Sequence, residues 1–502
     1  MNAPGMKLRD VLAGAEILQL AGSAEALISS IAYNSRKVAP GALFFALRGE
    51  KSDGNQFVSQ AIERGAIAIA SENPAPADLP TEISWVRAAH ARRALAISAA
   101  NFFGHPADHL EMAAITGTNG KTTTAYLIDS IFCAAGKTTG LLGTISYRTP
   151  KGVHSAPNTT PESLDFQQIL AEIAEAGGTH VALEASSHAL AMDRLWGCRF
   201  GAAVFTNLTR EHMDYHKDFE NYFSAKRLLF EGTGAGRPKC GVVNIDDPYG
   251  KRLCGLAKET LTYGLEAGAQ VTAKKFALAF SGLEFTAQTP AGKIAVHSPL
   301  VGRINVYNIL AAIGAALALG IEKQAIEAGI ANLKNVPGRF ERIDEGQPFL
   351  VIVDYAHTDD ALQNLLATAR ELSPSGRIII VFGAGGERDR TKRPLMGEAA
   401  GRGADLVVLT SDNPRSEDPL RIINDVVVGL QKVNAKYRIE PDRERAIPLA
   451  FEEARPGDMV LLAGKGHETY QILRDVTLDF DDRDMARRFL RERGYSKPAE
   501  SA

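Results

Sequence analysis

The chain has 502 residues, of which 45% are hydrophobic and 23% are charged. These shares exclude a disordered or fibrous chain, and at ~150 residues per domain the length predicts about three domains. Lysine and arginine number 56 and aspartate and glutamate 59, which gives a formal net charge of −3. With this net charge, the protein has no strong positive potential that would attract nucleic acid, so any anion must be bound by a few basic residues at a particular site.

The cysteine spacing and the N-terminal sequence indicate an intracellular chain. The four cysteines, Cys133, Cys198, Cys240 and Cys254, form no Cys-x-x-Cys pair and have no zinc-ligand spacing. This usage favours reduced, buried thiols. The N-terminus has no apolar signal segment, and the longest apolar stretch, 309–321, is too short to cross a bilayer. We therefore expect a cytoplasmic protein without a membrane span.

Strand-like runs alternate with helical patterns from the first segment onward, which is typical of an α/β fold. The first hundred residues predict three short strands and one helix, at 28–33, 42–47, 66–70 and 92–103. A Gly-His-Pro sequence closes the helix at 104–106. We place the first domain at 1–108.

The middle segment predicts a strand over 112–116 and a helix over 122–135, with a glycine-containing loop between them. Two further buried strands are expected at 181–183 and 202–205. A Pro-Gly pair at 337–338 separates a long helical stretch from a new strand pattern. The central domain is therefore placed at 109–336, as a P-loop-type parallel sheet.

The last segment, 337–502, predicts a Rossmann-like, doubly wound domain. Four β-rich runs are each followed by polar or glycine residues, at 349–353, 377–382, 406–409 and 459–462. Ligands of open parallel sheets bind beyond the carboxyl ends of the strands. We expect the four loops after these strands to converge on one crevice.

The most specific motif is Thr116-Gly117-Thr118-Asn119-Gly120-Lys121-Thr122-Thr123, between a predicted strand and a predicted helix. Glycines let backbone N–H groups approach phosphate oxygens, and the helix N-terminus adds positive charge. The lysine would neutralise the phosphates and the hydroxyl of Thr122 would bind Mg²⁺. The strict P-loop pattern has glycine where Ile115 stands, so a glycine-rich turn with a solvated lysine is the alternative.

A magnesium–nucleotide site also needs hard ligands at neighbouring strand ends. Glu184 follows an apolar run, and His212 belongs to a polar segment after the next strand. Alone, Glu184 would equally fit a capping carboxylate, and a single histidine is more often structural. Their position after parallel strands beside a phosphate loop favours a site containing both residues.

Together these motifs resemble the Mur ligases, the cytoplasmic ATP-dependent amide ligases of peptidoglycan synthesis. The resemblance covers nearly the whole chain, in the expected order. It rests on the phosphate loop and on the segments 184–188, 206–216, 222–230, 338–341, 354–358, 385–389, 412–415 and 464–468. It implies three domains, for a UDP-sugar, for ATP and for an incoming amino acid.

The resemblance implies sites for ATP, for Mg²⁺ and for catalysis. ATP would be bound by Gly117, Thr118, Asn119, Gly120, Lys121, Thr122, Thr123, Asn305, Arg339 and Asp354. The magnesium ligands would be Thr122, Glu184, His212 and Lys226, with Lys226 as N6-carboxylysine. The catalytic residues would be Lys121, Lys226, Arg339, Asp354 and His357. The addition of CO₂ to a neutral amine turns a cation into a carboxylate that can hold Mg²⁺.

The UDP-N-acetylmuramoyl-dipeptide site implied by the resemblance has two halves. They comprise Tyr33, Ser35, Glu50, Lys51 and Ser52 in the first domain, and Asn158, Thr159, Thr160, Ser186, Met192 and Arg194 in the second. Hydroxyl and amide donors with one arginine suit a diphosphate and a carboxylate. The family usually has glutamine at position 192, and methionine cannot donate that hydrogen bond.

The incoming amino acid would be bound in the third domain by Arg388, Asp412, Asn413, Pro414, Arg415, Gly464 and Glu468. Within the family, Arg415 is the residue that differs between members adding diaminopimelate and members adding lysine. A guanidinium can bind the second carboxylate of meso-diaminopimelate in bidentate fashion, and it would repel the ammonium of lysine. The Asp-Asn-Pro sequence would also suit a plain strand-to-helix turn.

The predicted function is ATP-dependent ligation of meso-2,6-diaminopimelate to UDP-N-acetylmuramoyl-L-alanyl-D-glutamate through an acyl phosphate, by a monomer with small-molecule substrates only. Three alternatives stay open. A lysine-adding ligase is the first, and an ATP-regulated binding protein without ligase activity is the second. The third, a dinucleotide-binding oxidoreductase, is prompted by Gly383-Ala384-Gly385-Gly386 but has Arg388 where the third glycine belongs.

Overall fold

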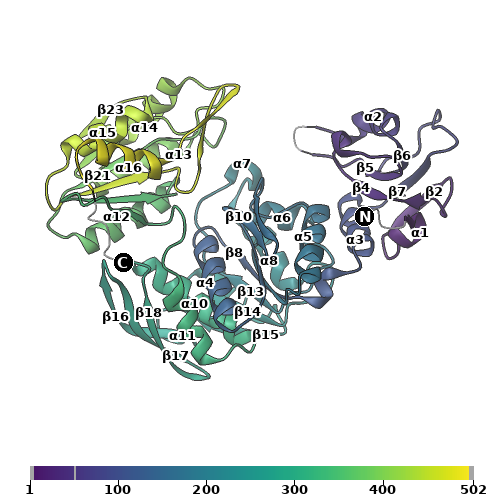
Figure 1. Cartoon of the computed structure of the whole chain (residues 1–502), viewed down its shortest axis with the longest axis horizontal. Helices are drawn as coiled ribbons and strands as arrows, with labels where there is room; N and C mark the ends of the chain where they lie inside the picture. Colours follow the sequence, from purple (N-terminus) through teal and green to yellow (C-terminus); the bar gives the residue numbers. More distant parts are fainter. Residues whose placement is uncertain (1–4, 50–51, 497–502) are drawn as a thin grey trace.

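The computed structural model describes residues 5–49 and 52–496. An N-terminal body, purple in Figure 1, and a C-terminal body, green to yellow, lie on either side of a central body. Each body contains its own β-sheet with helices on both faces. This is the expected three-domain α/β architecture.

The N-terminal body is built on a five-stranded sheet of order β2-β7-β6-β5-β4, in which only β2 runs antiparallel. Its strands are β2 Ile17–Ala21, β4 Ser30–Ala32, β5 Ala42–Phe45, β6 Ala66–Ser71 and β7 Ser84–Ala88. Its helices are α1 Leu8–Val11, α2 Val58–Glu63 and α3 Ala91–Phe102, and β1 Met6–Lys7 pairs with β3 Leu27–Ile28. Alternate residues of β5 enter two separate apolar cores, so both faces of the sheet are covered.

The central body contains an eight-stranded sheet of order β11-β10-β9-β12-β8-β13-β14-β15. Its strands are β8 Glu111–Thr116, β9 Thr139–Leu142, β10 Ser146–Thr149, β11 Gly152–Ser155, β12 His180–Glu184, β13 Ala202–Phe205, β14 Cys240–Asn244 and β15 Glu259–Tyr263. Ala113 and Ile115 of β8 pack into one core, and Met112 and Ala114 pack into the core on the opposite face. A strand buried on both faces explains the continuous apolar run before the phosphate loop.

Helices cover both faces of the central sheet. They are α4 Lys121–Ala134, α5 Ser163–Glu175, α6 Ser187–Ala191, α7 Met213–His216, α8 Phe219–Glu231, α9 Pro248–Lys251, α10 Arg303–Ala318 and α11 Lys323–Asn332. Helix α10 is apolar nearly all round because it lies between the sheet and α4. The ligand-facing N-terminus of α4 is thus anchored by a buried neighbour.

The C-terminal body has a six-stranded sheet of order β19-β20-β24-β21-β22-β23. Its strands are β19 Glu341–Ile343, β20 Leu350–Asp354, β21 Ile378–Phe382, β22 Leu406–Leu409, β23 Tyr437–Ile439 and β24 Met459–Ala463. Helices α12 Asp359–Leu372, α13 Lys392–Gly403 and α14 Pro419–Lys432 cover one face, and α15 Arg443–Glu453 and α16 Asp482–Glu492 the other. The hairpin β25 Tyr470–Leu473 and β26 Val476–Asp479 lies beside the loop after β22.

The central domain differs from the expected all-parallel sheet in two places. Strands β10 and β11 add an antiparallel edge, and a separate antiparallel sheet is formed by β16 Thr272–Ala279, β17 Gly282–Thr289 and β18 Gly292–Ser298. The three strands of the second sheet expose one face, so their sequences alternate apolar and polar residues instead of forming buried apolar runs. Reading the sequence for continuous apolar runs therefore does not find these three strands. Among the described residues, no helix is long and apolar enough to span a membrane.

Close packing of α11 on α4 depends on Gly329. A Cβ atom at this position would lie 2.4 Å from the Ile131 Cα, and the Gly329 carbonyl accepts a hydrogen bond from Ser130 at 2.7 Å. We predict that Gly329→Ala destabilises the protein by about 1–3 kcal/mol through overpacking, although alanine has the higher helix propensity. Thermal unfolding measures this, with Gln324→Ala on the exposed side of α11 as the control. Equal stability of the two variants would contradict the prediction.

Candidate functional site

The loop between β8 and α4 requires glycine at two positions. Gly117 has φ 148°, and a Cβ there would lie 1.8 Å from Thr206 Oγ1. Gly120, at the N-cap of α4, has φ 85°, and its Cβ would lie 2.3 Å from Asn308 Oδ1. Side chains rarely adopt such φ values. The backbone N–H groups at the start of α4 are therefore left accessible to a ligand.

Two lysines, half-buried Lys121 and buried Lys226, converge on this loop. Both ammonium groups donate to the Gly117 carbonyl, at 2.9 and 2.7 Å, and Lys121 also donates to the Thr118 carbonyl at 2.7 Å. Burial lowers the pKa of Lys121, and burial followed by the Lys121 charge holds the pKa of Lys226 well below its usual range. The surroundings of Lys226 therefore favour the neutral form of its amine.

Glu184, at the end of β12, faces the first turn of α4. Its carboxylate accepts hydrogen bonds from the Thr122 hydroxyl at 3.0 Å, and from the Thr144 N–H at 2.8 Å and hydroxyl at 3.0 Å. From the C-terminal body, Arg339 Nη2 donates to the same Thr122 hydroxyl at 3.2 Å. The expected pairing of Thr122 and Glu184 is present, and Arg339 lies beside it.

Sequence reasoning missed a second acid, Glu211. It lies between two predicted site residues, with Oε2 3.7 Å from His212 Nε2 and Oε1 3.3 Å from His357 Nε2. Burial raises its pKa, but the His357 hydrogen bond and the Lys121 charge help to hold the pKa well below the usual range. Burial also lowers the pKa of His212 to about 4, so this imidazole is neutral at pH 7. Glu211 is next to His212 in the sequence, but its contact with His357 joins it to a side chain from another domain.

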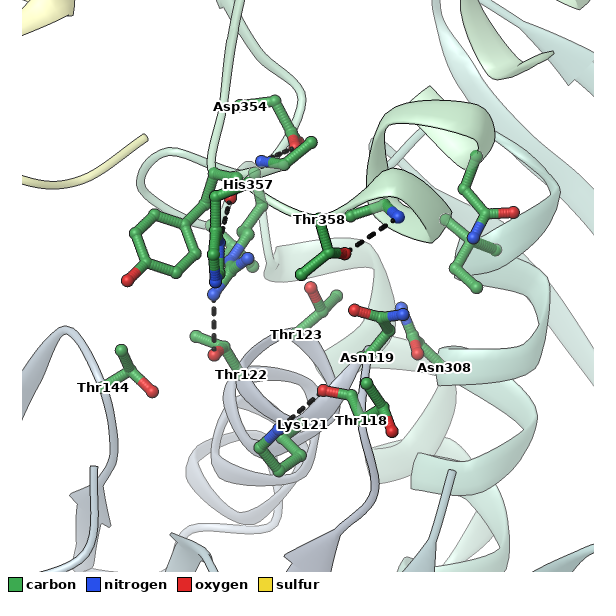
Figure 2. A pocket seen from close by; sticks show the side chains of 18 of the residues that line it. Thr118, Asn119, Lys121, Thr122, Thr123, Thr144, Asn308, Asp354, His357 and Thr358 are labelled. Carbon is green, nitrogen blue, oxygen red and sulfur yellow. Dashed lines mark hydrogen bonds between the residues drawn. The ribbon is translucent and has the colours of Figure 1, made fainter. Parts of the chain in front are cut away.

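These groups line one cavity of about 260 Å³ between the central and C-terminal bodies. Figure 2 shows Thr122 and Thr123 on α4 opposite the loop that carries His357 and Thr358. The cavity contains fifteen of the predicted residues: Thr118, Asn119, Gly120, Lys121, Thr122, Thr123, Thr159, Glu184, Ser186, His212, Lys226, Asn305, Arg339, Asp354 and His357. An unpredicted apolar part is formed by Leu300, Ile304 and Leu365.

Asp354 and Asn305 shape the wall of this cavity through local hydrogen bonds. Asp354 accepts from the Phe340 N–H at 2.7 Å and from the Ala356 N–H at 2.8 Å, and burial raises its pKa. Asn305 donates to the Val301 carbonyl at 2.7 Å. Both side chains therefore hold the loops that carry neighbouring pocket residues.

The C-terminal body contacts the phosphate loop directly. Asp360, in the first turn of α12, accepts hydrogen bonds from Asn119 Nδ2 at 2.7 Å and from Thr209 Oγ1 at 3.2 Å. Arg210 donates to Thr391 Oγ1 at 3.0 Å. The pocket is thus built from segments more than 200 residues apart in the sequence, as the separation of Asn119 and Asp360 shows.

A second group of predicted residues lies between the N-terminal and central bodies. Tyr33 donates to Asp165, and Glu162 forms ion pairs with both Arg92 at 3.2 Å and Arg194 at 3.3 Å. Arg92 also donates to the Arg48 carbonyl at 3.1 Å. Glu162, which sequence reasoning missed, joins the two halves of this group.

The other members of the second group occupy several loops. Thr160 Oγ1 donates to the Glu184 carbonyl at 2.7 Å and accepts from the Ser186 N–H at 3.0 Å, which connects this group to the cavity. Ser35 donates to Gln60 at 2.6 Å, and Met192 Sδ lies 3.8 Å from Arg194 Nη2, as a weak acceptor. The Asn158 carbonyl accepts from Tyr147, and Ser52 is exposed. Glu50 and Lys51 lie outside the described residues.

The third group of predicted residues surrounds the carboxyl ends of β21, β22 and β24. Asn413 Nδ2 donates to Glu468 at 2.9 Å, and buried Lys465 lies 3.2 Å from the same Glu468 oxygen. Arg415 Nη1 donates to the Gly386 carbonyl at 2.6 Å. A Cβ on Gly464 would lie 2.7 Å from Asp412 Oδ2, and a Cβ on Gly386 only 1.9 Å from the Pro414 carbonyl. Arg388 is exposed in the loop after β21.

The loop after β20 forms part of the cavity instead of this third group, and Gly466 links the two. A Cβ on Gly466 would lie 2.7 Å from the Tyr355 Cβ, and the Tyr355 and His467 ring centroids are 4.9 Å apart. The expectation that the four strand-end loops converge on one crevice is therefore wrong, because the loops touch one another but divide between two sites.

The donor set beside Thr122 fits Mg²⁺. The oxygens of Thr122, Thr144 and Glu184 are hard ligands, and the lowered pKa values of His212 and Lys226 favour the uncharged forms of both side chains beside a cation. Among residues 5–49 and 52–496, no group of three or more His, Cys, Asp or Glu side chains forms a metal cluster of its own. Binding of the ion would therefore depend on hydroxyls and on the phosphates of a nucleotide.

These features define an α/β protein with a phosphate-binding loop at a domain boundary, and the family follows from comparison with known proteins. Residues 27–119 match the model "Mur ligase family, catalytic domain", 115–316 the "Mur ligase middle domain" and 338–466 the "Mur ligase, glutamate ligase domain". The chain belongs to the Mur ligase family.

Individual relatives cover nearly the full length. The UDP-N-acetylmuramoyl-L-alanyl-D-glutamate–2,6-diaminopimelate ligase of Solibacter usitatus is 54% identical over 94% of this chain and 95% of its own. The protein of the same name from Geobacillus thermodenitrificans is 46% identical over 93% and 95%. A solved structure of a ligase with this name has a TM-score of 0.68 at 34% identity, covering 98% of this chain and 100% of its own.

The glycines at the two ends of α4 provide a test of the phosphate loop. Gly120 and Gly136 both have positive φ, but only a Cβ on Gly120 would clash, whereas a Cβ on Gly136 would meet nothing within 4 Å. We predict that Gly136→Ala loses about 1 kcal/mol of stability through backbone strain and that Gly120→Ala loses more, because the Asn308 side chain must also move. Only Gly120→Ala should lose nucleotide binding, measured by titration of a fluorescent ATP analogue. If Gly120→Ala binds the ATP analogue with wild-type affinity, the prediction that this loop binds the nucleotide phosphates is contradicted.

Proposed function

We propose that the chain is the ATP-dependent ligase that joins meso-2,6-diaminopimelate to UDP-N-acetylmuramoyl-L-alanyl-D-glutamate. The observation that carries the proposal is the convergence of Lys121, Lys226 and Arg339 on one cavity at the N-terminus of α4, because N–H donors so placed suit a phosphate. The substrate follows from the names of the relatives and from Arg415. We also propose that the protein is a monomer and acts in the cytoplasm.

The three groups of residues would divide the substrates among the domains. Domain 1–108 and the adjoining part of the central domain would bind the UDP-sugar, with Arg194 for an anionic group. Domain 109–336 would bind ATP, its phosphates at the α4 N-terminus and its base in the apolar part of the cavity near Asn305. Domain 337–502 would bind the diamino acid, with Glu468 for an ammonium group.

The reaction would proceed through an acyl phosphate. The side-chain carboxylate of D-glutamate attacks the γ-phosphorus of ATP and ADP leaves. The amine then attacks the acyl carbon and phosphate leaves. Lys121 and Arg339 would oppose the negative charge that develops on the transferring phosphoryl group, and Asp354 and His357 would hold the loop opposite. Bound Mg²⁺, held by Thr122, Glu184, His212 and carbamylated Lys226, would supply further charge neutralisation.

The function is tested by phosphate release. We expect release to require both the UDP-linked dipeptide and the diamino acid, with diaminopimelate strongly preferred to lysine. Arg415→Met should lower kcat/KM for diaminopimelate about 10²-fold, because a charge-assisted bidentate contact is lost. The effect on lysine should be much smaller. Arg421→Met, an exposed arginine of α14, is the control. Absence of release with any amine would refute the ligase, and a preference for lysine would refute the specificity.

Carbamylation of Lys226 has its own test. Only a neutral amine adds CO₂, and burial lowers the pKa of Lys226 well below its usual range, which favours the neutral amine, whereas an exposed lysine remains protonated. After incubation with ¹³C-bicarbonate at pH 7, NMR should show one carbamate signal that Lys226→Gln removes and Lys239→Gln, at an exposed site, retains. Lys226→Ala should lower kcat about 10²-fold or more, with partial recovery in acetate. A carbamate signal that persists in Lys226→Gln would contradict the assignment.

A further inference from the structure

The loops that would bind the diamino acid have a strained backbone. Glu387, after β21, has φ 52°, and Arg415, after β22, has φ 53°. Residues with a Cβ rarely occupy this left-handed region, and they do so where the surrounding structure compels it. The backbone of Arg415 is bonded to the hairpin, with its N–H on the Ile472 carbonyl at 3.2 Å and its carbonyl on the Arg474 N–H at 2.8 Å, whereas its guanidinium is directed by the Gly386 carbonyl in the loop after β21.

Arg393, in the first turns of α13, connects the loops after β21 and β22. Its side chain is fully buried, and it makes two hydrogen bonds to Glu417, with Nη1 at 3.0 Å and Nη2 at 2.8 Å. Nη1 also donates to Asp425 at 2.9 Å, and Nη2 donates to the Gly385 carbonyl at 3.2 Å. One guanidinium thus joins the loop after β21, the loop after β22 and helix α14.

The contacts continue from Arg393 to the predicted pocket. Glu417, paired with Arg393, accepts a hydrogen bond from the Glu387 N–H. The Gly386 N–H donates to the Asn413 carbonyl at 3.0 Å, and the Gly386 carbonyl accepts from Arg415 Nη1 at 2.6 Å. A guanidinium has five N–H donors, so this bond sets the direction of Arg415 without using all its donors. A shift of the loop after β21 would therefore redirect Arg415.

Lysine could not replace Arg393 in this network. A guanidinium has a rigid fork that matches a carboxylate, whereas an ammonium is a point charge. The hydrogen bond from Arg393 lowers the pKa of Glu417 to about 2, so Glu417 is ionised at neutral pH and needs a paired cation. A lysine would keep the charge and lose the two-pronged contact and the bond to Gly385.

We infer that Arg393 is the positioning residue that sets the selectivity of this domain for a diamino acid with a second carboxylate, by fixing the loop whose Gly386 carbonyl directs the Arg415 guanidinium. The inference rests on the proposed function. Arg393 itself is fully buried and would act only through Glu417, Gly385 and Gly386. It would therefore affect one substrate and leave the other two unaffected.

The test compares Arg393→Lys with the wild-type full-length chain in the phosphate-release assay. We expect KM for meso-diaminopimelate to rise about tenfold or more and the preference over lysine to fall by a similar factor. The KM values for ATP and for the UDP-linked dipeptide should stay within about twofold. Arg377→Lys is the matched control. Arg377 also pairs with a carboxylate, Asp458, at 2.6 Å. It precedes β21 and so lies at the amino end of this strand, whereas the loops of the predicted pocket follow the carboxyl ends.

A second variant, Glu417→Gln, tests the inference if Arg393→Lys does not fold. Glu417→Gln keeps the shape and one acceptor oxygen, and it should raise KM for diaminopimelate in the same direction with less effect on thermal unfolding. Unchanged KM and selectivity in both variants would overturn the inference, as would an equal rise of all three KM values, which indicates a merely structural role. Wild-type protein without diaminopimelate-dependent phosphate release would instead refute the proposed function, and the inference with it.

Discussion

The candidate site depends on two lysine amines that share one carbonyl oxygen. Lys121 and Lys226 both donate to the Gly117 carbonyl inside the cavity. Burial followed by the charge of Lys121 lowers the pKa of Lys226 well below its usual range, because two cations so close together disfavour each other. The lowered pKa matters for reactivity, because a neutral amine can add CO₂, whereas a protonated lysine cannot. The phosphates of a nucleotide would add to the counter-charge of the acids that line the cavity, Glu184, Glu211 and Asp354.

The same charge balance explains why the cavity lies between two domains. The central domain contributes the two lysines, and the C-terminal domain contributes Arg339 and His357. Hydrogen bonds from Asn119 and Thr209 to Asp360 hold the two bodies in register around the phosphate loop. A nucleotide in this cavity would contact both bodies, so its binding and their relative position are coupled. Within the C-terminal domain, the ion pair between buried Arg393 and half-buried Glu417 joins two loops at the other site.

Much of the fold could be read from the sequence, for a physical reason. Strands such as β8 and β21 are buried on both faces, so they appear as continuous apolar runs ended by glycine or polar residues. The phosphate loop was equally clear, because the required φ values admit only glycine. Strands β16–β18 were missed because one face is exposed and their pattern merely alternates. Glu211 and Glu162 were missed because a lone acid has no local signature.

The sequence by itself determined the class of fold, the phosphate loop and the identity of the groups able to bind phosphate, carboxylate and ammonium, because these depend on local pattern and on residue chemistry. Only the tertiary structure decided which groups meet. It places Glu211 against His357 and buries Lys226 beside Lys121. It also joins Arg393 to Glu417 and, through the neighbouring loops, to Arg415. Contacts of this kind depend on burial and on loops brought together from distant strands, and neither property is contained in any short segment of the chain.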